Sequence, residues 1–298
     1  MNLLITGAWH CTQEQLERLA DLGHRIFFLQ NETDPLPIPY EWVEGVICNG
    51  LFLHHPVERF GNLRYVQLTS AGFDRVPMDY INTNGIALYN ARGVYSIPMA
   101  EFAVCGVLQL YKQSRFFTEN QKNREWKKHR GLLELHGKTV CILGCGSVGT
   151  ECAKRFGAFG CRVIGVDSLP KEHCCYNEMV SADRLDEMLA VADIVILTLP
   201  LTDMSRGLFN SQRLAGMKQG TVLVNLARGA IVDTAALIRW LKTGQGAAVL
   251  DVFEEEPLPA GSLLWQMENV IITPHNSFVG DGNAARLFDV IRSNLGKV

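Results

Sequence analysis

Gly144-Cys145-Gly146-Ser147-Val148-Gly149 follows directly on the apolar run Thr139–Leu143 and leads into a segment with helical character. A G-x-G-x-x-G match is weak evidence by itself, but a strand before it and a helix after it are the context in which such a loop binds a dinucleotide. Gly144 permits the tight turn, Gly146 lets the backbone approach a pyrophosphate, and Gly149 lets the helix pack closely on the strand. The alternative is a glycine turn with a purely structural role.

The residues around this loop refine the prediction. Ser147 and Val148 open the expected helix, whose unpaired N–H groups would face the phosphates of a cofactor. Asp167 ends the next expected strand, 18 residues beyond Gly149. A carboxylate there would bind the ribose hydroxyls and repel a 2′-phosphate, so we expect NAD rather than NADP. For Asp167, an acidic residue of a surface turn is the alternative.

Apolar runs of strand length repeat on both sides of the loop. Those before it lie at Leu3–Thr6, Arg25–Leu29, Gly45–Cys48, Tyr65–Thr69 and Ile86–Tyr89. Those from the loop onward lie at Thr139–Leu143, Arg162–Asp167, Ile194–Leu199, Thr221–Asn225, Ala247–Asp251 and Val270–Thr273. Most are continuous runs of Val, Ile and Leu, which is typical of strands buried on both faces of a parallel sheet. The pattern predicts an α/β protein with two doubly wound parallel-sheet domains, one of them a Rossmann domain.

Helix signals fall between these runs. Thr12-Gln13-Glu14-Gln15 has the form of a capping box and opens a helix that closes at Gly23. Residues 97–126 predict one long helix, with Pro98 in its first turn. Further helices are expected at Glu151–Phe159, Ala182–Ala190, Ser211–Lys218 and Thr234–Lys242, the last with Asp233 as its N-cap.

The composition excludes several classes of protein. At 298 residues the chain is long for one compact core and favours two domains. A net charge of −3 without a block of like charges argues against a nucleic-acid surface. No window approaches the roughly 18 consecutive apolar residues of a membrane helix, and the N-terminus lacks the basic region of a signal peptide. We expect no nucleic acid and no membrane as a partner.

The nine cysteines favour a reducing compartment. Cys105, Cys141 and Cys161 stand inside apolar runs and are expected to be buried, inert thiols. We therefore expect a cytoplasmic protein. Cys174-Cys175 lies in a polar segment, but two adjacent thiols make a poor metal site, and we expect no bound metal.

Titratable residues follow three of the later strands, at the strand ends where open α/β sheets bind ligands. They are Arg228 in Asn-Leu-Ala-Arg-Gly, Glu256 in Leu-Asp-Val-Phe-Glu-Glu-Glu-Pro and His275 in Thr-Pro-His. A 2-oxo acid needs a cation with fork geometry for its carboxylate, which arginine supplies. Its carbonyl oxygen needs a proton donor, which histidine supplies near neutral pH when a carboxylate keeps it protonated and oriented.

Each of these three residues also has a plainer explanation. Arg228 is compatible with a helix cap or a surface ion pair, and His275 with a loop histidine whose neighbours satisfy it. Glu256 is compatible with a solvated acidic run. The residues have the right types for the chemistry, but the sequence alone does not bring them together.

Taken in order, these segments resemble the D-isomer-specific 2-hydroxyacid dehydrogenase family. The resemblance spans nearly the whole chain and rests on the glycine loop with Asp167, the three runs above, Leu199-Pro200-Leu201-Thr202 and Ser70-Ala71-Gly72-Phe73-Asp74. It implies an NAD-dependent oxidoreductase that interconverts a 2-oxo acid and a D-2-hydroxy acid by hydride transfer.

The resemblance also implies a role for each site residue. Arg228 would hold the substrate, His275 would be the acid and base, and Glu256 would pair with it. The substrate carboxylate would be bound by the backbone of Ser70, Ala71 and Gly72. The cofactor site would further include Leu199, Pro200, Ala227 and Asp251, with Asp251 near the nicotinamide amide.

The same resemblance implies a domain organisation. A flavodoxin-like substrate domain would be built from residues 1–94 and 276–298, and an NAD-binding Rossmann domain, residues 95–275, would be inserted between them. The long helix near 97–126 would then lie in a homodimer interface.

The residues expected near the substrate leave its side chain open. Cys48-Asn49-Gly50 stands where phosphoglycerate-specific relatives tend to have an arginine, although Arg59, Arg64 and Arg75 remain candidate phosphate ligands. A phosphoglycerate dehydrogenase and a hydroxypyruvate or glyoxylate reductase are therefore the specific alternatives. A non-catalytic NADH-sensing corepressor of the same fold is a third, and the intact set of arginine, glutamate and histidine argues against it.

Overall fold

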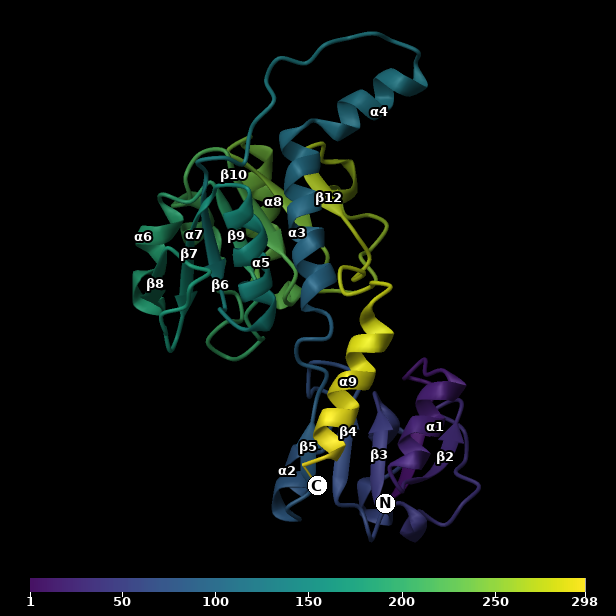
Figure 1. The fold of residues 1–298 in the computed structure, drawn as a ribbon. Helices are drawn as coiled ribbons and strands as arrows, with labels where there is room; N and C mark the ends of the chain where they lie inside the picture. The colour runs from purple at the N-terminus through teal and green to yellow at the C-terminus, as the bar shows by residue number, and fades with distance from the viewer. Residues whose placement is uncertain (298) are drawn as a thin grey trace. The chain divides into compact units, whose positions relative to one another are not determined.

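The computed structural model describes residues 1–297, and internal contacts divide the chain into two compact units. The first comprises Met1–Tyr95 and the C-terminal segment from Gly280, and the second is Ser96–Val279 (Figure 1). His275 therefore belongs to the same unit as the glycine loop and Arg228, so the geometry that relates them is that of a single compact body.

The first unit contains a five-stranded parallel sheet in the order β2-β1-β3-β4-β5, which is the flavodoxin-like order. Its strands are β1 (Asn2–Thr6), β2 (Arg25–Leu29), β3 (Gly45–Cys48), β4 (Tyr65–Leu68) and β5 (Ala87–Tyr89). Its helices are α1 (Gln13–Asp21), α2 (Met78–Thr83) and α9 (Asn283–Leu295). The apolar face of α9 packs against Leu3 and Ile5 of β1. The first strand and the last helix therefore share one hydrophobic core.

The second unit contains a seven-stranded parallel sheet in the order β12-β11-β10-β9-β6-β7-β8. Counted from β6, this is the Rossmann order with one strand added beyond the sixth. The strands are β6 (Thr139–Leu143), β7 (Arg162–Asp167), β8 (Glu178–Ser181), β9 (Ile194–Leu197), β10 (Thr221–Asn225), β11 (Gly246–Leu250) and β12 (Val270–Ile272). The helices are α3 (Ser96–Tyr111), α4 (Ser114–Lys122), α5 (Ser147–Ala158), α6 (Leu185–Leu189), α7 (Ser211–Ala215) and α8 (Thr234–Lys242).

The expected α/β architecture and parallel strands are confirmed, and so are two helix starts. The Thr12 hydroxyl accepts a hydrogen bond from the Gln15 N–H at 3.2 Å, and the Gln15 side chain accepts one from the Thr12 N–H at 3.0 Å. Asp233 caps α8 through the Ala236 N–H at 2.8 Å. On the sheet, α3 packs against α5, and a Cβ at Gly106 would lie only 2.5 Å from a methyl carbon of Val249 in β11. Glycine therefore permits the close approach of α3 to the sheet.

The prediction of one long helix over residues 97–126 is wrong. Helix α3 ends at Tyr111, and Gln113 adopts a left-handed conformation with φ 52°, which interrupts the helical hydrogen-bond ladder before α4 begins. Helix α4 ends at Lys122, and Arg124 is again left-handed with φ 58°. The apolar spacing described α3 correctly, but it carried no signal for the two turns that follow.

Two other features differ from the sequence analysis. Strand β8 was not predicted, because its short run Glu178–Ser181 begins with a charged residue and resembles a loop. Cys105 is exposed rather than buried, since it lies on the side of α3 that faces away from α5 and the sheet, whereas Cys141 and Cys161 are buried as expected. Across the described residues, none of the helices has the length and apolar character required to cross a membrane.

Candidate active site

The glycine loop has the geometry that a dinucleotide site requires. Gly144 has φ +89°, and a Cβ there would lie 2.7 Å from the Leu199 backbone nitrogen. A Cβ at Gly149 would lie 2.2 Å from the Gly144 carbonyl oxygen, so helix α5 could not approach the loop with a larger residue there. Gly146 has no neighbouring atom within 4 Å of such a position, which leaves open space just before the N-terminus of α5 at Ser147. Ser147 and Val148 thus begin the helix, with their N–H groups at its positive end.

Asp167 lies at the carboxyl end of β7 and faces this loop. Its Oδ2 accepts a hydrogen bond from the Cys145 N–H at 2.8 Å, and its Oδ1 accepts one from the Leu169 N–H at 3.1 Å. The carboxylate is therefore held at the loop rather than free in a surface turn. Burial raises the pKa of the Cys145 thiol to about 11, so this cysteine inside the glycine loop stays protonated and inert near neutral pH.

The segment after β9 packs against the glycine loop. The Thr198 hydroxyl donates a hydrogen bond to the Gly144 carbonyl at 2.7 Å, and the Ser205 hydroxyl donates one to the Pro200 carbonyl at 2.8 Å. These bonds hold Leu199 and Pro200, which the resemblance assigns to the cofactor site, beside the loop. Thr198 and Ser205 were not among the predicted residues, because a hydroxyl that shapes a turn has no distinctive sequence signature.

His275 and Glu256 form a hydrogen-bonded pair. The Nδ1 of His275 lies 2.8 Å from Oε2 of Glu256, and the other carboxylate oxygen accepts a hydrogen bond from the Phe253 N–H at 2.9 Å. The carboxylate is thus held by the backbone on one side and holds the imidazole on the other. Because Nδ1 faces the carboxylate, Nε2 is the nitrogen available to a reactant. The His275 side chain is 43% exposed.

The buried Asp251 shapes the loop that carries the histidine. Its carboxylate accepts hydrogen bonds from the Thr273 hydroxyl at 2.6 Å and from the N–H groups of Asn276 at 2.8 Å and Ser277 at 2.9 Å. The His275 N–H also donates to the Asp251 carbonyl at 2.8 Å, and His275 itself is left-handed with φ 50°. The resemblance implied only a cofactor contact for Asp251, and its role in building this turn was missed.

Arg228 lies on a turn after β10 that packs tightly against the glutamate segment. The Asn225 side chain accepts a hydrogen bond from the Ala227 N–H and donates one to the Arg228 carbonyl, both at 3.1 Å, which fixes the turn. At Gly229 a Cβ would lie 1.8 Å from the Phe253 carbonyl carbon. The Arg228 turn and the segment leading to Glu256 are therefore in backbone contact. Arg228, Glu256 and His275 all follow the carboxyl ends of β10, β11 and β12, which are neighbours in the sheet.

The predicted carboxylate-binding segment belongs to the first unit. Ser70, Ala71 and Gly72 follow β4, and the Asn90 side chain donates a hydrogen bond to the Ala71 carbonyl at 2.6 Å. The Ser70 hydroxyl donates to the Gly72 carbonyl at 3.1 Å. Among the described residues, no acceptor takes a hydrogen bond from the Ala71 and Gly72 N–H groups. Two adjacent backbone donors are thus available to an anion.

Two further features lie outside the expected cofactor and substrate residues. The potential ligand atoms of His173, Cys174 and Cys175 lie within 4.8 Å of one another. The structure therefore adds a histidine to the cysteine pair.

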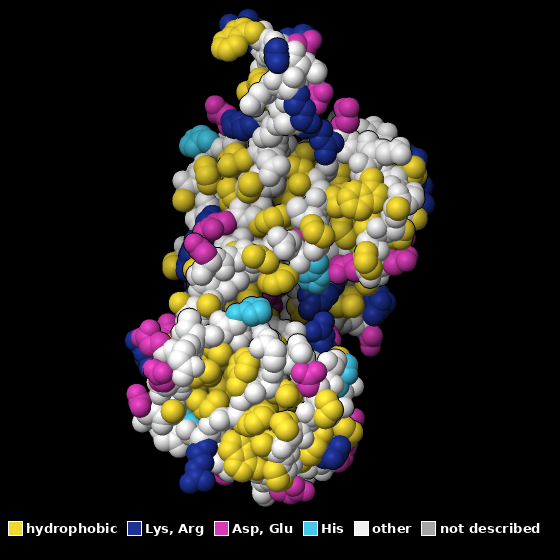
Figure 2. Space-filling model, turned by 90° about the vertical axis from the view of Figure 1, so that its right-hand side faces the viewer, with side chains coloured by type: hydrophobic (Ala, Val, Ile, Leu, Met, Phe, Trp, Pro, Cys, Tyr) yellow, Lys and Arg dark blue, Asp and Glu magenta, His cyan; other side chains and the backbone are white. Residues whose placement is uncertain are grey.

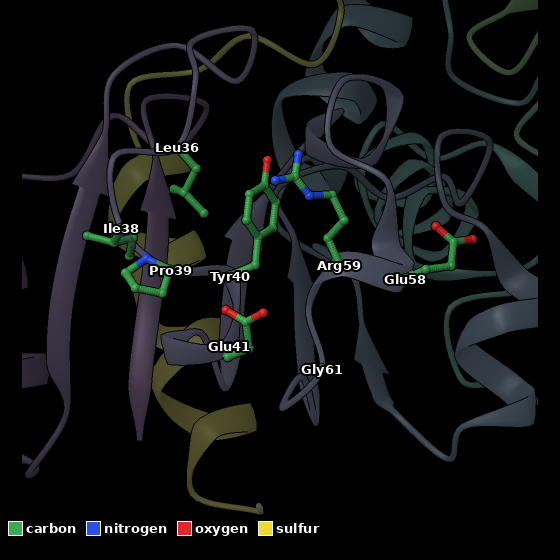
Figure 3. Close-up of a pocket in the computed structure, with 8 residues that line it drawn as sticks. All are labelled: Leu36, Ile38, Pro39, Tyr40, Glu41, Glu58, Arg59 and Gly61. Atoms are coloured by element: carbon green, nitrogen blue, oxygen red, sulfur yellow. The ribbon is translucent and has the colours of Figure 1, made fainter.

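In the first unit, a groove of about 520 Å³ is lined by Leu36, Ile38, Pro39, Tyr40, Glu41, Glu58, Arg59 and Gly61 (Figure 3). The Arg59 guanidinium lies 3.8 Å from the centre of the Tyr40 ring.

A Rossmann sheet with a glycine loop, an acidic residue at the end of its second strand, and a hydrogen-bonded histidine and glutamate is typical of a nicotinamide-dependent dehydrogenase. Comparison with known proteins identifies the family. Residues 104–277 match the family described as "D-isomer specific 2-hydroxyacid dehydrogenase, NAD binding domain", and the chain belongs to this family.

Individual relatives agree with this assignment. The chain is 34% identical to an (S)-sulfolactate dehydrogenase of Chromohalobacter salexigens over 80% of its own length and 79% of that protein. It is 35% identical to a D-3-phosphoglycerate dehydrogenase of Methanocaldococcus jannaschii over 74% of its own length, but the match spans only 42% of that protein. Among solved structures, a family member from Aeromonas salmonicida is similar with a TM-score of 0.83 and 32% identity, over 99% of this chain and 96% of that one.

Proposed function

We propose that this chain interconverts a 2-oxo acid and a D-2-hydroxy acid, with NAD as the redox partner. The observation that supports this most directly is the hydrogen-bonded pair of His275 and Glu256, with Nδ1 and Oε2 2.8 Å apart. The pair lies at the same sheet edge as the glycine loop. A protein that only senses NADH has no need of an oriented acid–base pair, so the pair also argues against the corepressor alternative.

Each site residue of this chain would have a distinct role in the reaction. Arg228 would hold the substrate carboxylate and orient the oxo group, assisted, as the resemblance implies, by the backbone amides of Ala71 and Gly72. When bound, the reduced nicotinamide supplies the hydride that adds to the substrate C2. His275 would donate a proton from Nε2 to the oxygen that becomes the hydroxyl, and Glu256 stabilises the charged imidazole and selects its tautomer. In the reverse direction the neutral histidine takes that proton.

A substrate panel tests the proposed function. NADH oxidation by the purified protein should be measured with glyoxylate, pyruvate, hydroxypyruvate, phenylpyruvate and phosphohydroxypyruvate, with NADPH in parallel. We expect turnover of at least one acid, with NADH preferred because the Asp167 carboxylate would repel a 2′-phosphate. Replacing Asp167 with serine should reduce that preference. NADH binding without turnover of any of these acids would contradict the proposed reaction and favour the sensor.

We propose in addition that the domains and the site are assembled as the resemblance implies. Residues 1–94 and 276–298 would form the substrate domain and residues 95–275 the NAD domain. A cytoplasmic location is part of the same proposal. It is supported by the cysteines: all nine lie in the described part of the chain and are free thiols.

A homodimer is the final part of this proposal. Helix α4 and the segment after it project from the second unit (Figure 1) and return where the Leu133 N–H donates to the Tyr111 carbonyl at 3.0 Å. The projecting segment exposes Phe117, Leu132, Leu133 and, at 97%, Trp126. Figure 2 shows hydrophobic side chains at the projecting tip and on the face of the second unit beside it. Exposed apolar side chains on a projection are typical of a surface that a second copy covers.

The mass in solution, measured by light scattering, checks the dimer. We expect the wild-type protein to be dimeric and Trp126→Arg to shift it toward monomer. Leu22→Arg introduces the same charge at an exposed apolar residue of α1's C-terminal end, outside the projecting segment, and should leave the mass unchanged. A monomeric wild-type protein would contradict this part of the proposal.

A further inference from the structure

Glu32 holds a negative charge at the carboxyl edge of the first unit's sheet. The residue follows β2, and its side chain bridges the ends of β1 and β3. Its Oε1 accepts hydrogen bonds from the Thr6 hydroxyl and the Asn49 N–H, both at 2.7 Å, and its Oε2 accepts one from the Gly50 N–H at 2.6 Å. Such short distances are typical of bonds to an ionised acceptor. Burial, and after it the charge of Glu32, raises the pKa of the adjacent Cys48 thiol, which places that charge beside the end of β3.

The groups that Glu32 occupies are the ones that an anionic ligand would use. Two successive backbone N–H groups, those of Asn49 and Gly50, point to one place at the end of a strand, and such pairs commonly bind phosphate or carboxylate oxygens. Here the protein fills the pair with its own carboxylate.

This occupied pair lies next to the segment expected to bind the substrate carboxylate. Strands β3 and β4 are neighbours, Cys48 pairs with Leu68, and the Thr69 N–H donates to the Cys48 carbonyl at 2.8 Å. Asn49-Gly50 and Ser70–Gly72 therefore begin one strand spacing apart, roughly 4.8 Å. A substrate whose carboxylate lies on the Ala71 and Gly72 amides would have its side chain within reach of Glu32.

We propose that Glu32 determines the substrate class: it disfavours 2-oxo acids whose side chain carries a second anionic group and admits those whose side chain is neutral. This inference rests on the proposed function. A phosphate near Glu32 would meet a like charge in a partly desolvated site and would find both amide donors already bonded. A side-chain hydroxyl would meet neither obstacle, because it can donate to a remaining lone pair of the carboxylate.

Two substrates that differ only by a phosphate test the proposal. The ratio of kcat/KM for hydroxypyruvate to that for phosphohydroxypyruvate should be measured in the wild-type protein, Glu32→Gln and Asp34→Asn. We expect the wild-type protein to favour hydroxypyruvate, and Glu32→Gln to shift the ratio about tenfold or more toward the phosphorylated acid, because one like charge is removed. Asp34→Asn removes the same charge from the same loop, but Asp34 bonds to the Asn31 side chain rather than to the β3 amides, so the ratio should not change.

The outcomes separate the two hypotheses. Turnover with an unchanged ratio in Glu32→Gln, or a wild-type preference for the phosphorylated acid, would overturn the role of Glu32 and leave the proposed function intact. Reduction of neither acid by any of the three proteins would overturn the role of Glu32. It would overturn the proposed function as well only if no other acid of the panel were reduced while NADH still bound. The wild-type ratio tests the proposal even if Glu32→Gln does not fold.

Discussion

Replacing His275 with asparagine is expected to lower kcat by about 10²–10⁴-fold, the usual contribution of a positioned proton donor. Asparagine suits this position because His275 is left-handed, with φ 50°, a conformation that asparagine tolerates better than most residues. The loop should therefore keep its bonds to Asp251 while the proton donor is lost. Steady-state rates with the best acid of the panel, together with NADH affinity, measure the effect.

The acidic run before Pro257 offers a matched control for the histidine pair. Glu256→Gln removes the charge that stabilises the imidazolium, and we expect kcat to fall about tenfold or more. Glu255→Gln removes the same charge one residue earlier, where no bond to His275 exists, and should leave the rate nearly unchanged. Near-full turnover in His275→Asn, or equal effects of the two glutamine variants, would show that the pair is not the acid–base group.

Replacing Gly229 with alanine is expected to reduce both stability and activity strongly. The added carbon would lie 1.8 Å from the Phe253 carbonyl carbon and 2.1 Å from its oxygen, and both are backbone atoms that no rotamer change can move away. The Arg228 turn and the Phe253 segment must then separate. We expect a loss of about 3 kcal/mol or more in the free energy of unfolding. Since a displacement of about 1 Å can cost roughly 10²-fold in rate, kcat/KM should fall by that order.

Thermal unfolding and kcat/KM measure this effect, and Gly157→Ala provides the control. Gly157 lies near the end of α5, and a Cβ there meets no atom within 4 Å. Alanine in a helix should be neutral or stabilise the protein by about 0.5–1 kcal/mol. If Gly229→Ala unfolded at the wild-type temperature with wild-type activity, the close contact between the two segments would not exist in solution.

The sequence by itself determined the fold class and the regular elements that hold the site. Strands of continuous Val, Ile and Leu, such as Thr221–Asn225, are buried on both faces of a sheet, so their pattern is independent of the details of their neighbours. The glycine loop and the capping box at Thr12 are equally local, because a turn or a helix start depends on residues a few positions apart. Glu256 and His275 were identified by residue type and by resemblance, and their pairing could only be expected.

Only the tertiary structure decided how distant segments meet. Three contacts show this: that of Gly229 with Phe253, the bonds of Asp251 to the histidine loop, and the bonds of Glu32 to the end of β3. Each of them joins residues that are 17 or more positions apart in the sequence. Their hydrogen bonds and close approaches arise because neighbouring parallel strands bring their carboxyl ends to one edge. The breaks after Tyr111 and Lys122 were missed for the opposite reason: a left-handed residue without glycine, such as Gln113, leaves no mark in the apolar pattern of the helix before it.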